Sequence, residues 1–250
     1  RAMGTLGAAS AVGMMVGPGS AGLLAGWNLG LSLLLISVLP VVALAVAWRM
    51  LPKDTPHISL KKTTLKLTDS RIRRVVFTSF AAMCSVVLCQ VVVGFLAMDR
   101  FGLTPNEAAR VSGIALAVVG VVLFCSQMVL RRLSWSPSRF IRIGSLVTAA
   151  GFVATVFVPS PLYLWLSYGV IAAGMGWIYP SLSALAANSV EAHEQGSAAG
   201  SVASAQGLGT IAAPIIGTVV YQWSSGAPFA LSALLILAAA LWPSAKADAA

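Results

Sequence analysis

The side chains that usually carry out chemistry are few in this 250-residue chain, and they form no recognisable reaction site. The three cysteines, Cys84, Cys89 and Cys125, lie in apolar stretches, where a thiol behaves as a small hydrophobic group. His57 and His193 stand in separate polar segments, without the ligand spacing of a zinc site. We find no nucleophile beside a base. The sequence therefore predicts a protein that is not an enzyme and holds no metal or other cofactor.

Glycine and proline show a more regular spacing than any reactive side chain. The segment GTLGAASAVGMMVGPGSAG, residues 4–22, contains Gly4, Gly13, Gly17, Pro18 and Gly22. A proline inside a helix removes a backbone hydrogen bond and kinks the helix, and glycines let a second helix approach its backbone closely. Close packing alone accounts for many such small-residue patterns. The added proline favours a gating role, in which a kinked helix pivots against its neighbour.

The composition places these residues in membrane helices. Hydrophobic residues make up 58% of the chain and charged residues only 9%, whereas a soluble domain carries about 25% charged residues. A bilayer crossing needs about 20 mostly apolar residues, and the charge-free stretches, divided at Gly/Pro/Ser-rich turns, provide eight of them. The expected all-α membrane protein has spans at about 3–25, 29–48, 75–98, 111–130, 140–158, 162–189, 200–222 and 228–243.

The charges divide the chain and orient it. Residues 1–50 are expected to form a helix pair, 51–74 a polar basic linker, and 75–250 a six-helix unit. The loops of one side carry 14 of the 16 Lys and Arg residues, and the other side carries Arg100 and Arg110. This asymmetry assigns the basic side to the cytoplasm of a multi-pass protein of the inner cell membrane. The net charge of +9 is thus a topology signal, and the sequence lacks the basic–aromatic interleaving of nucleic-acid binding.

An internal repeat suggests that the unit of the fold is six helices long. A shift of 196 residues places the first expected helix on the seventh. Coincidence of small residues is the alternative explanation, although the proline and tryptophan matches are less common. The aligned pairs are Gly4 and Gly200, Ala9 and Ala205, Gly13 and Gly209, Pro18 and Pro214, Trp27 and Trp223, and Gly30 and Gly226.

The glycine–proline segment resembles the fifth-helix antiporter motif of the major facilitator superfamily. Its spacing is kept, with Ala21 where the family prefers glycine. Weaker similarities are the Arg131-Arg132 pair and the segments GMGWIYPS and EQGSAAGS, whereas the family's loop signature is not recognisable after Gln127. The resemblance implies helices five to twelve of a twelve-helix fold, with four helices preceding this chain. It also implies export of drugs or small amphipathic metabolites by alternating access, driven by the proton gradient.

The resemblance further implies that residues 75–98 and 162–189 line the substrate path, because the first and fourth helices of each half do so in the family. For each candidate side chain, an interhelical hydrogen bond or simple packing is the alternative role. The candidates are Phe80, Gln90, Tyr168, Trp177, Tyr179 and, in the seventh helix, Gln206, with expected kinks at Pro180 and Pro214.

No ionisable side chain lies well inside any expected span, although such groups usually carry protons through transporters. A proton-coupling carboxylate is therefore expected in the four preceding helices. An uptake permease of the same fold, or a membrane scaffold or sensor without transport, stays open as an alternative. The expected partners are a small-molecule substrate and the lipid bilayer, without nucleic acid, and the sequence indicates no oligomeric state.

Overall fold

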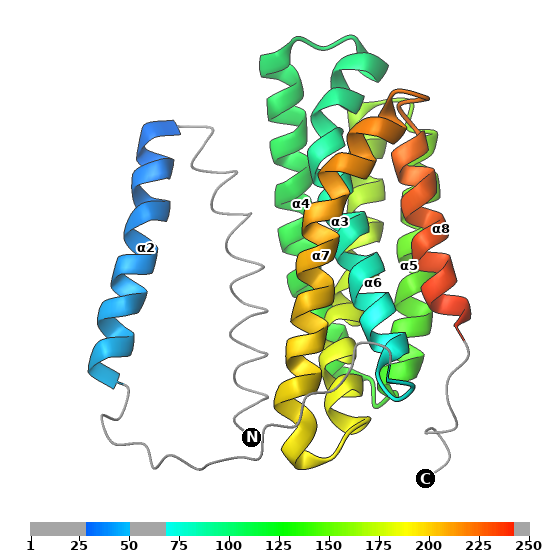
Figure 1. The fold of residues 1–250 in the computed structure, drawn as a ribbon. Coiled ribbons are helices and arrows are strands. Elements are labelled where there is room, and N and C mark those ends of the chain that lie inside the picture. Colours follow the sequence, from blue (N-terminus) through cyan, green and yellow to red (C-terminus); the bar gives the residue numbers. More distant parts are fainter. Residues whose placement is uncertain (1–28, 51–68, 243–250) are drawn as a thin grey trace.

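A computed structural model of the chain describes residues 29–50 and 69–242, and this part is entirely helical and loop, without strands (Figure 1). The prediction of an all-α fold is confirmed. The helices are α2 (Leu29–Met50), α3 (Arg73–Phe101), α4 (Pro105–Arg132), α5 (Pro137–Val156), α6 (Pro161–Asn188), the short 3-10 helix η1 (Ala192–Glu194), α7 (Gln195–Tyr221) and α8 (Ala227–Leu241).

The first expected span, 3–25, and its Gly4, Gly13, Gly17, Pro18 and Gly22 motif lie outside the described residues. Five described helices, α3 to α7, are long and apolar enough to cross a bilayer. The helix α8, with 15 residues, and the apolar stretch Ser37–Met50 of α2 are shorter. The total of eight crossings therefore stays a prediction.

Large apolar side chains cover much of the outer surface of the described helices. Val121 of α4 and Ile211 of α7 are 65% and 68% exposed. In water such a surface would be strongly unfavourable, whereas in a bilayer it contacts lipid or another helix. The exterior thus agrees with the membrane assignment made from composition.

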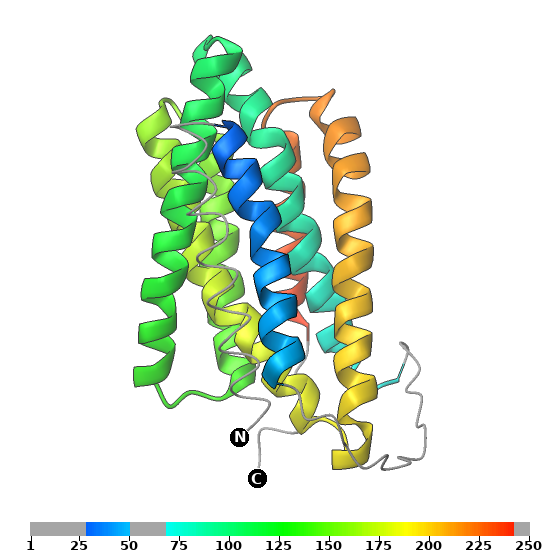
Figure 2. The same cartoon turned by 90° about the vertical axis from the view of Figure 1, so that its left-hand side faces the viewer.

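The six helices α3–α8 run beside one another as a single bundle, and α2 lies to one side of it (Figures 1 and 2). The helix α3 packs against α7 and α8, α5 packs against α6 and α8, and α4 packs against α6. Phe152, Leu88 and Phe229 are fully buried between these helices. The arrangement brings α3 and α6 together in the bundle, at the positions expected to line a substrate path.

Two glycine contacts explain why α6 and α7 lie so close to their neighbours. A Cβ at Gly174 of α6 would overlap the Thr148 Oγ1 and the Gly144 carbonyl of α5. A Cβ at Gly209 of α7 would lie 2.8 Å from the Phe80 carbonyl oxygen of α3. Real Cβ atoms do not approach other atoms this closely, so only glycine permits either contact. Small residues therefore set the depth of both helix seams.

The helix ends correct the sequence-based boundaries. The helix α4 begins at Pro105, six residues before the expected start at 111. There Thr104 and Glu107 form a capping box: the Thr104 hydroxyl accepts the Glu107 N–H, and the Glu107 carboxylate accepts the Thr104 N–H at 2.9 Å. The preceding helix, α3, continues to Phe101, and Gly102 then ends it with a φ of 64°. The boundaries at 111 and 98 were wrong because a charged turn ends the apolar span without ending the helix.

Candidate functional site

A side chain from α4 bonds to the α6 backbone one turn before the proline inside that helix. Pro180 lies inside α6 and has no N–H, so the carbonyl of Gly176, four residues earlier, loses its normal helical partner. The Gln127 side chain of α4 donates from Nε2 to this carbonyl oxygen at 3.2 Å. The freed acceptor is thus satisfied within the apolar interior, where an unsatisfied carbonyl is costly.

A second hydrogen bond runs in the opposite direction between the same helices. The Trp177 indole Nε1 of α6 donates to the Ser126 carbonyl of α4 at 3.2 Å. Gly176 is buried, and a Cβ there would overlap the Ser126 Oγ. We name the residues Ser126, Gln127, Gly176 and Trp177 the α4–α6 exchange, because one side chain of each helix donates a hydrogen bond to a backbone carbonyl of the other helix.

Tyr168 joins α6 to the other expected path helix. Its hydroxyl donates to the Cys89 carbonyl of α3 at 3.0 Å, and the side chain is buried. Tyr168 and Trp177 therefore both make the interhelical hydrogen bonds that were the alternative to substrate contact. Tyr168 therefore lies between the two expected path helices, α3 and α6, whereas Trp177 bonds to α4. A role of either side chain in substrate binding stays a prediction.

The remaining candidates are distributed along α3, α6 and α7. Phe80 is half-buried and lines a groove between α3 and α7. Gln90 is exposed on α3, and Tyr179 is half-buried against the core. Gln206 is half-buried on α7, and its main-chain carbonyl accepts a hydrogen bond from the Thr210 hydroxyl at 3.0 Å. Their roles in a substrate path also stay predictions.

The second expected kink residue, Pro214, lies inside α7. Its own carbonyl accepts a hydrogen bond from the Thr218 hydroxyl at 2.8 Å. A threonine hydroxyl that bonds back to the preceding turn often bends a helix. Both features fall in the same part of α7.

The end of the bundle at which α3 and α5 begin is named here the basic end. A cluster of charged side chains lies there. The Arg71 guanidinium donates to both carboxylate oxygens of Glu194, at 2.7 and 3.1 Å. It also pairs with Asp69 at 3.0 Å. Hydrogen bonds from Arg71 hold the pKa of the Asp69 carboxyl below its ordinary value. Because Glu194 is only 7% exposed, this bidentate pair joins the start of α3 firmly to the η1 turn before α7.

Polar contacts also tie the loops at the opposite end. The Tyr221 hydroxyl of α7 donates to the Asp99 carboxylate of α3 at 2.6 Å. Next to it, Arg100 donates to the Val156 carbonyl at 2.9 Å and to the Ser225 hydroxyl at 3.3 Å. Both ends of the bundle are therefore held by specific polar contacts between segments that are far apart in the sequence. Among the described residues, no group of three or more His, Cys, Asp or Glu side chains could hold a metal ion.

Comparison with known proteins identifies the family of this fold. The family model described as the Major Facilitator Superfamily matches residues 1–168 and 134–245, which together cover nearly the whole chain. The chain belongs to the Major Facilitator Superfamily. This membership places the protein among transporters rather than enzymes, as the sequence predicted, and supports the membrane assignment.

Two curated relatives of this superfamily member are named for multidrug resistance, and one of the two names adds an efflux pump. Multidrug resistance protein 2 of Bacillus subtilis (strain 168) is 25% identical over 272 residues, covering all of this chain and 66% of that protein. A multi-drug resistance efflux pump PmrA homolog of Lactococcus lactis subsp. lactis (strain IL1403) is 24% identical, covering 90% of this chain and 58% of that protein. The chain thus spans less than two thirds of the length of these two relatives.

Solved structures share the fold of this superfamily member. The Major Facilitator Superfamily transporter FucP in the outward conformation matches with a TM-score of 0.62 and 17% identity, over 84% of this chain and 52% of FucP. The peptide transporter POT (E310Q mutant) in complex with sulfate matches with a TM-score of 0.59 and 18% identity, over 68% of this chain and 36% of POT. At these identities the likeness concerns the fold alone.

Proposed function

We propose that the chain is part of a secondary active transporter that exports drugs or small amphipathic metabolites in exchange for protons. The names of the two multidrug resistance relatives support the substrate class, and the efflux pump in the second name supports the direction of transport. The mechanism is alternating access, in which two helical halves rock around a site near the bilayer midplane.

The structural observation that carries this proposal is the construction of α6. The helix contains Pro180 in its interior, touches the backbone of α5 at Gly174, and is bonded to α4 through the α4–α6 exchange. A helix held tightly on two sides can change its tilt together with its neighbours while the contacts between them stay closed. Helices α4, α5 and α6, joined in this way, could move as one rigid body when the two halves of the transporter rock against each other.

We assign α3–α8 to the C-terminal half of the transporter, as helices seven to twelve, and α2 to the sixth helix. The basic end then faces the cytoplasm together with the linker 51–74, in the inner cell membrane. The excess of Lys and Arg on this side supports the assignment. Cysteine accessibility in intact cells tests it, since a reporter cysteine at Ser136 should stay unlabelled by an impermeant maleimide, whereas one at Ser225 should be labelled.

We propose that the proton-coupling carboxylate lies outside residues 29–50 and 69–242. Within the described helices, the acidic residues Asp99 and Glu107 belong to terminal turns rather than to the middle of a span. The energy source would be the proton gradient, without an organic or metal cofactor.

Accumulation of a fluorescent cation in whole cells tests the direction of transport. Cells that express the complete encoded protein should retain less ethidium than control cells, and a protonophore should abolish the difference. Higher retention than in control cells would favour the uptake permease. A cell function that persists after bulky substitution of both Gly17 and Pro18 would favour a scaffold or sensor.

A further inference from the structure

Near the basic end, α3 and α7 leave a groove between them. Its volume is about 270 Å³, and among residues 29–50 and 69–242 Arg73 is the one charged residue that lines it. Sites that enclose drug-sized ligands measure about 300–1,000 Å³, so this groove suits part of a long molecule rather than a whole ligand. It is lined by Arg73, Val76, Phe77 and Phe80 of α3 and by Ala205 and Leu208 of α7.

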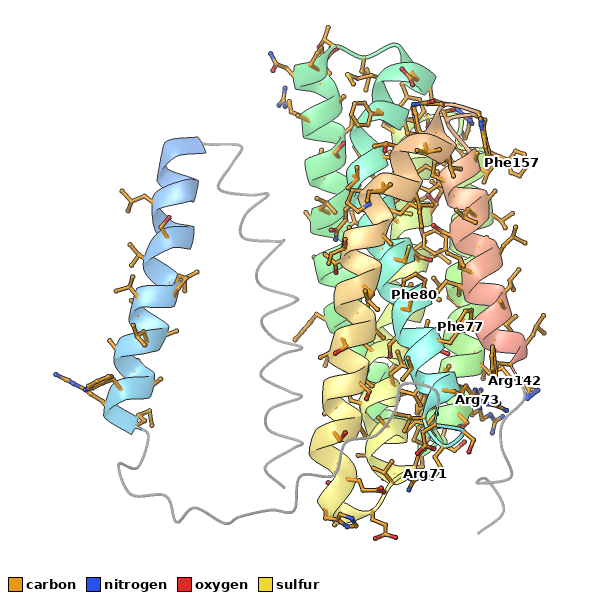
Figure 3. The ribbon with its side chains drawn as sticks, in the orientation of Figure 1. Arg71, Arg73, Phe77, Phe80, Arg142 and Phe157 are labelled. Carbon is orange, nitrogen blue, oxygen red and sulfur yellow. The ribbon has the colours of Figure 1, made fainter. Side chains whose placement is uncertain are left out.

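The lining residues of α3 give the groove a polar end and an apolar length. Arg73, Val76, Phe77 and Phe80 follow helical spacing, so they share one face of α3. Figure 3 shows Arg73 near the basic end, with Phe77 and then Phe80 farther along the helix. The groove therefore presents a cation at the membrane surface and an apolar wall that continues toward the membrane interior.

The charge of Arg73 is available to an anion. Its neighbour Arg71 is already bound to Asp69 and Glu194. Arg73 is exposed, and no carboxylate within residues 29–50 or 69–242 forms an ion pair with it. Arg142 of α5 lies at the same end (Figure 3) and adds a second positive charge. The carboxylates of Asp69 and Glu194 at this end are both bound to Arg71, so an anion there would meet the positive charges of Arg73 and Arg142.

Aromatic side chains mark the depth of this site in the membrane. The rings of Phe77 and Trp242 lie 5.3 Å apart, centroid to centroid. Tryptophan is enriched at the level of lipid headgroups. With Trp242 at that level, Arg73, one turn before Phe77, would meet the headgroup phosphates, and Phe80, farther along α3, would meet the acyl chains.

We propose that this groove binds one anionic phospholipid, with its phosphate on the Arg73 guanidinium and part of an acyl chain along Phe77, Phe80 and Leu208. Basic pockets between membrane helices on the cytoplasmic side are a known physical solution for anionic headgroups. A small soluble anion would use Arg73 but gain nothing from the apolar wall. A cationic amphiphile would be repelled by Arg73 and Arg142. The site requires no transport activity to be occupied.

Lipid titration of the purified complete protein tests this site. Native mass spectrometry in detergent should show saturable binding of dioleoylphosphatidylglycerol and much weaker binding of dioleoylphosphatidylcholine. Arg73→Gln should weaken phosphatidylglycerol binding about fivefold, the effect of about one basic contact at an anionic membrane surface. Arg139→Gln is the matched control, because Arg139 lies at the same end but stacks over Trp135, 4.8 Å from its ring.

A second variant tests the apolar part of the groove without changing the charge. Leu208→Trp places a bulky ring at a position that is 56% exposed, so it should fill the groove and reduce phosphatidylglycerol binding while the fold persists. Equal weakening by Arg73→Gln and Arg139→Gln would show diffuse surface charge and overturn the site. Equal binding of the two lipids, or full competition by inorganic phosphate, would overturn it as well.

Discussion

The hydrogen bond from Gln127 to the Gly176 carbonyl of α6 leads to a quantitative prediction about Gln127 and Pro180. Replacing Gln127 with Met keeps the length and volume of the side chain but removes the donor. The Gly176 carbonyl, bonded at 3.2 Å in the native protein, would then have neither the Gln127 donor nor the N–H that proline lacks. Interhelical hydrogen bonds in membrane proteins contribute about 0.6 kcal/mol on average and up to about 1.7 kcal/mol. Because Gly176 is buried, we expect Gln127→Met to lower the free energy of unfolding by about 1 kcal/mol.

The same substitution should cost much less when Pro180 is replaced. Pro180→Ala restores an N–H that can donate to the Gly176 carbonyl within α6, so this carbonyl no longer needs Gln127. Titration with sodium dodecyl sulfate in mixed micelles, followed by helical circular dichroism, measures the free energy of unfolding of the four variants of this double-mutant cycle. We expect a coupling free energy of about 0.5–1 kcal/mol between the two positions.

Equal losses from Gln127→Met in the native protein and in the Pro180→Ala variant would refute the reasoning, since the effect would then arise from packing rather than from the freed carbonyl. The absence of any loss in the native background would refute it too. This measurement needs no substrate, so its outcome is independent of whether the protein transports drugs.

Three further perturbations test the other contacts through the stability of the protein, measured by thermal unfolding in detergent, and the second of them also needs a transport assay. Gly209→Ala should destabilise the protein by about 1–3 kcal/mol, because the new methyl group overlaps the α3 backbone. Gly207→Ala is the control and should not destabilise it, because a Cβ at Gly207 meets nothing within 4 Å. Similar shifts of the unfolding midpoint for both variants would contradict the close contact between α3 and α7. Tyr168→Phe should lower stability by about 0.6 kcal/mol and leave the half-saturating substrate concentration unchanged, and a large rise in that concentration would instead indicate substrate contact. The pKa of Asp69 is lowered in the folded protein. Its ionised carboxylate therefore stabilises the fold at any pH above the ordinary aspartate pKa of about 3.9. This contribution is lost as the pH falls through the lowered pKa of the folded state. The midpoints of the native protein and Asp69→Asn should therefore converge in acid, and a constant difference between neutral and strongly acidic pH would argue against the pairing with Arg71.

Much of the helical framework follows from simple rules about charge and lipid. The charge-free stretch 162–189 coincides closely with α6, Pro161–Asn188, because both the bilayer and the flanking Ser160-Pro161 turn impose the same limits. The same rule misplaced the start of α4, since Glu107 completes a helix cap instead of ending a helix. Hydropathy predicts the limits of the apolar stretch. A helix can extend beyond these limits where its first turn is capped, as at Thr104 and Glu107.

The contacts between helices were less accessible from the sequence. Pro180 predicted a kink in α6, but the partner of the freed carbonyl depends on which helix packs beside it. Gln127 carried no local signal beyond being an amide in an apolar stretch, and only the packing of α4 on α6 brings it to Gly176. The pairing of Arg71 with Glu194, 123 residues apart, likewise depends on tertiary structure. A search for polar donors opposite helix-internal prolines would have found the first of these contacts.

The position of Cys125 offers a built-in reporter for motion in this half of the protein. It immediately precedes Ser126 and Gln127 on α4 and is exposed, while Cys84 and Cys89 are buried. A membrane-permeable thiol reagent should therefore modify the described helices first at Cys125. Its rate of modification under different ion gradients would register whether α4 and α6 separate or travel as a unit, and the native thiol makes this possible without engineering the chain.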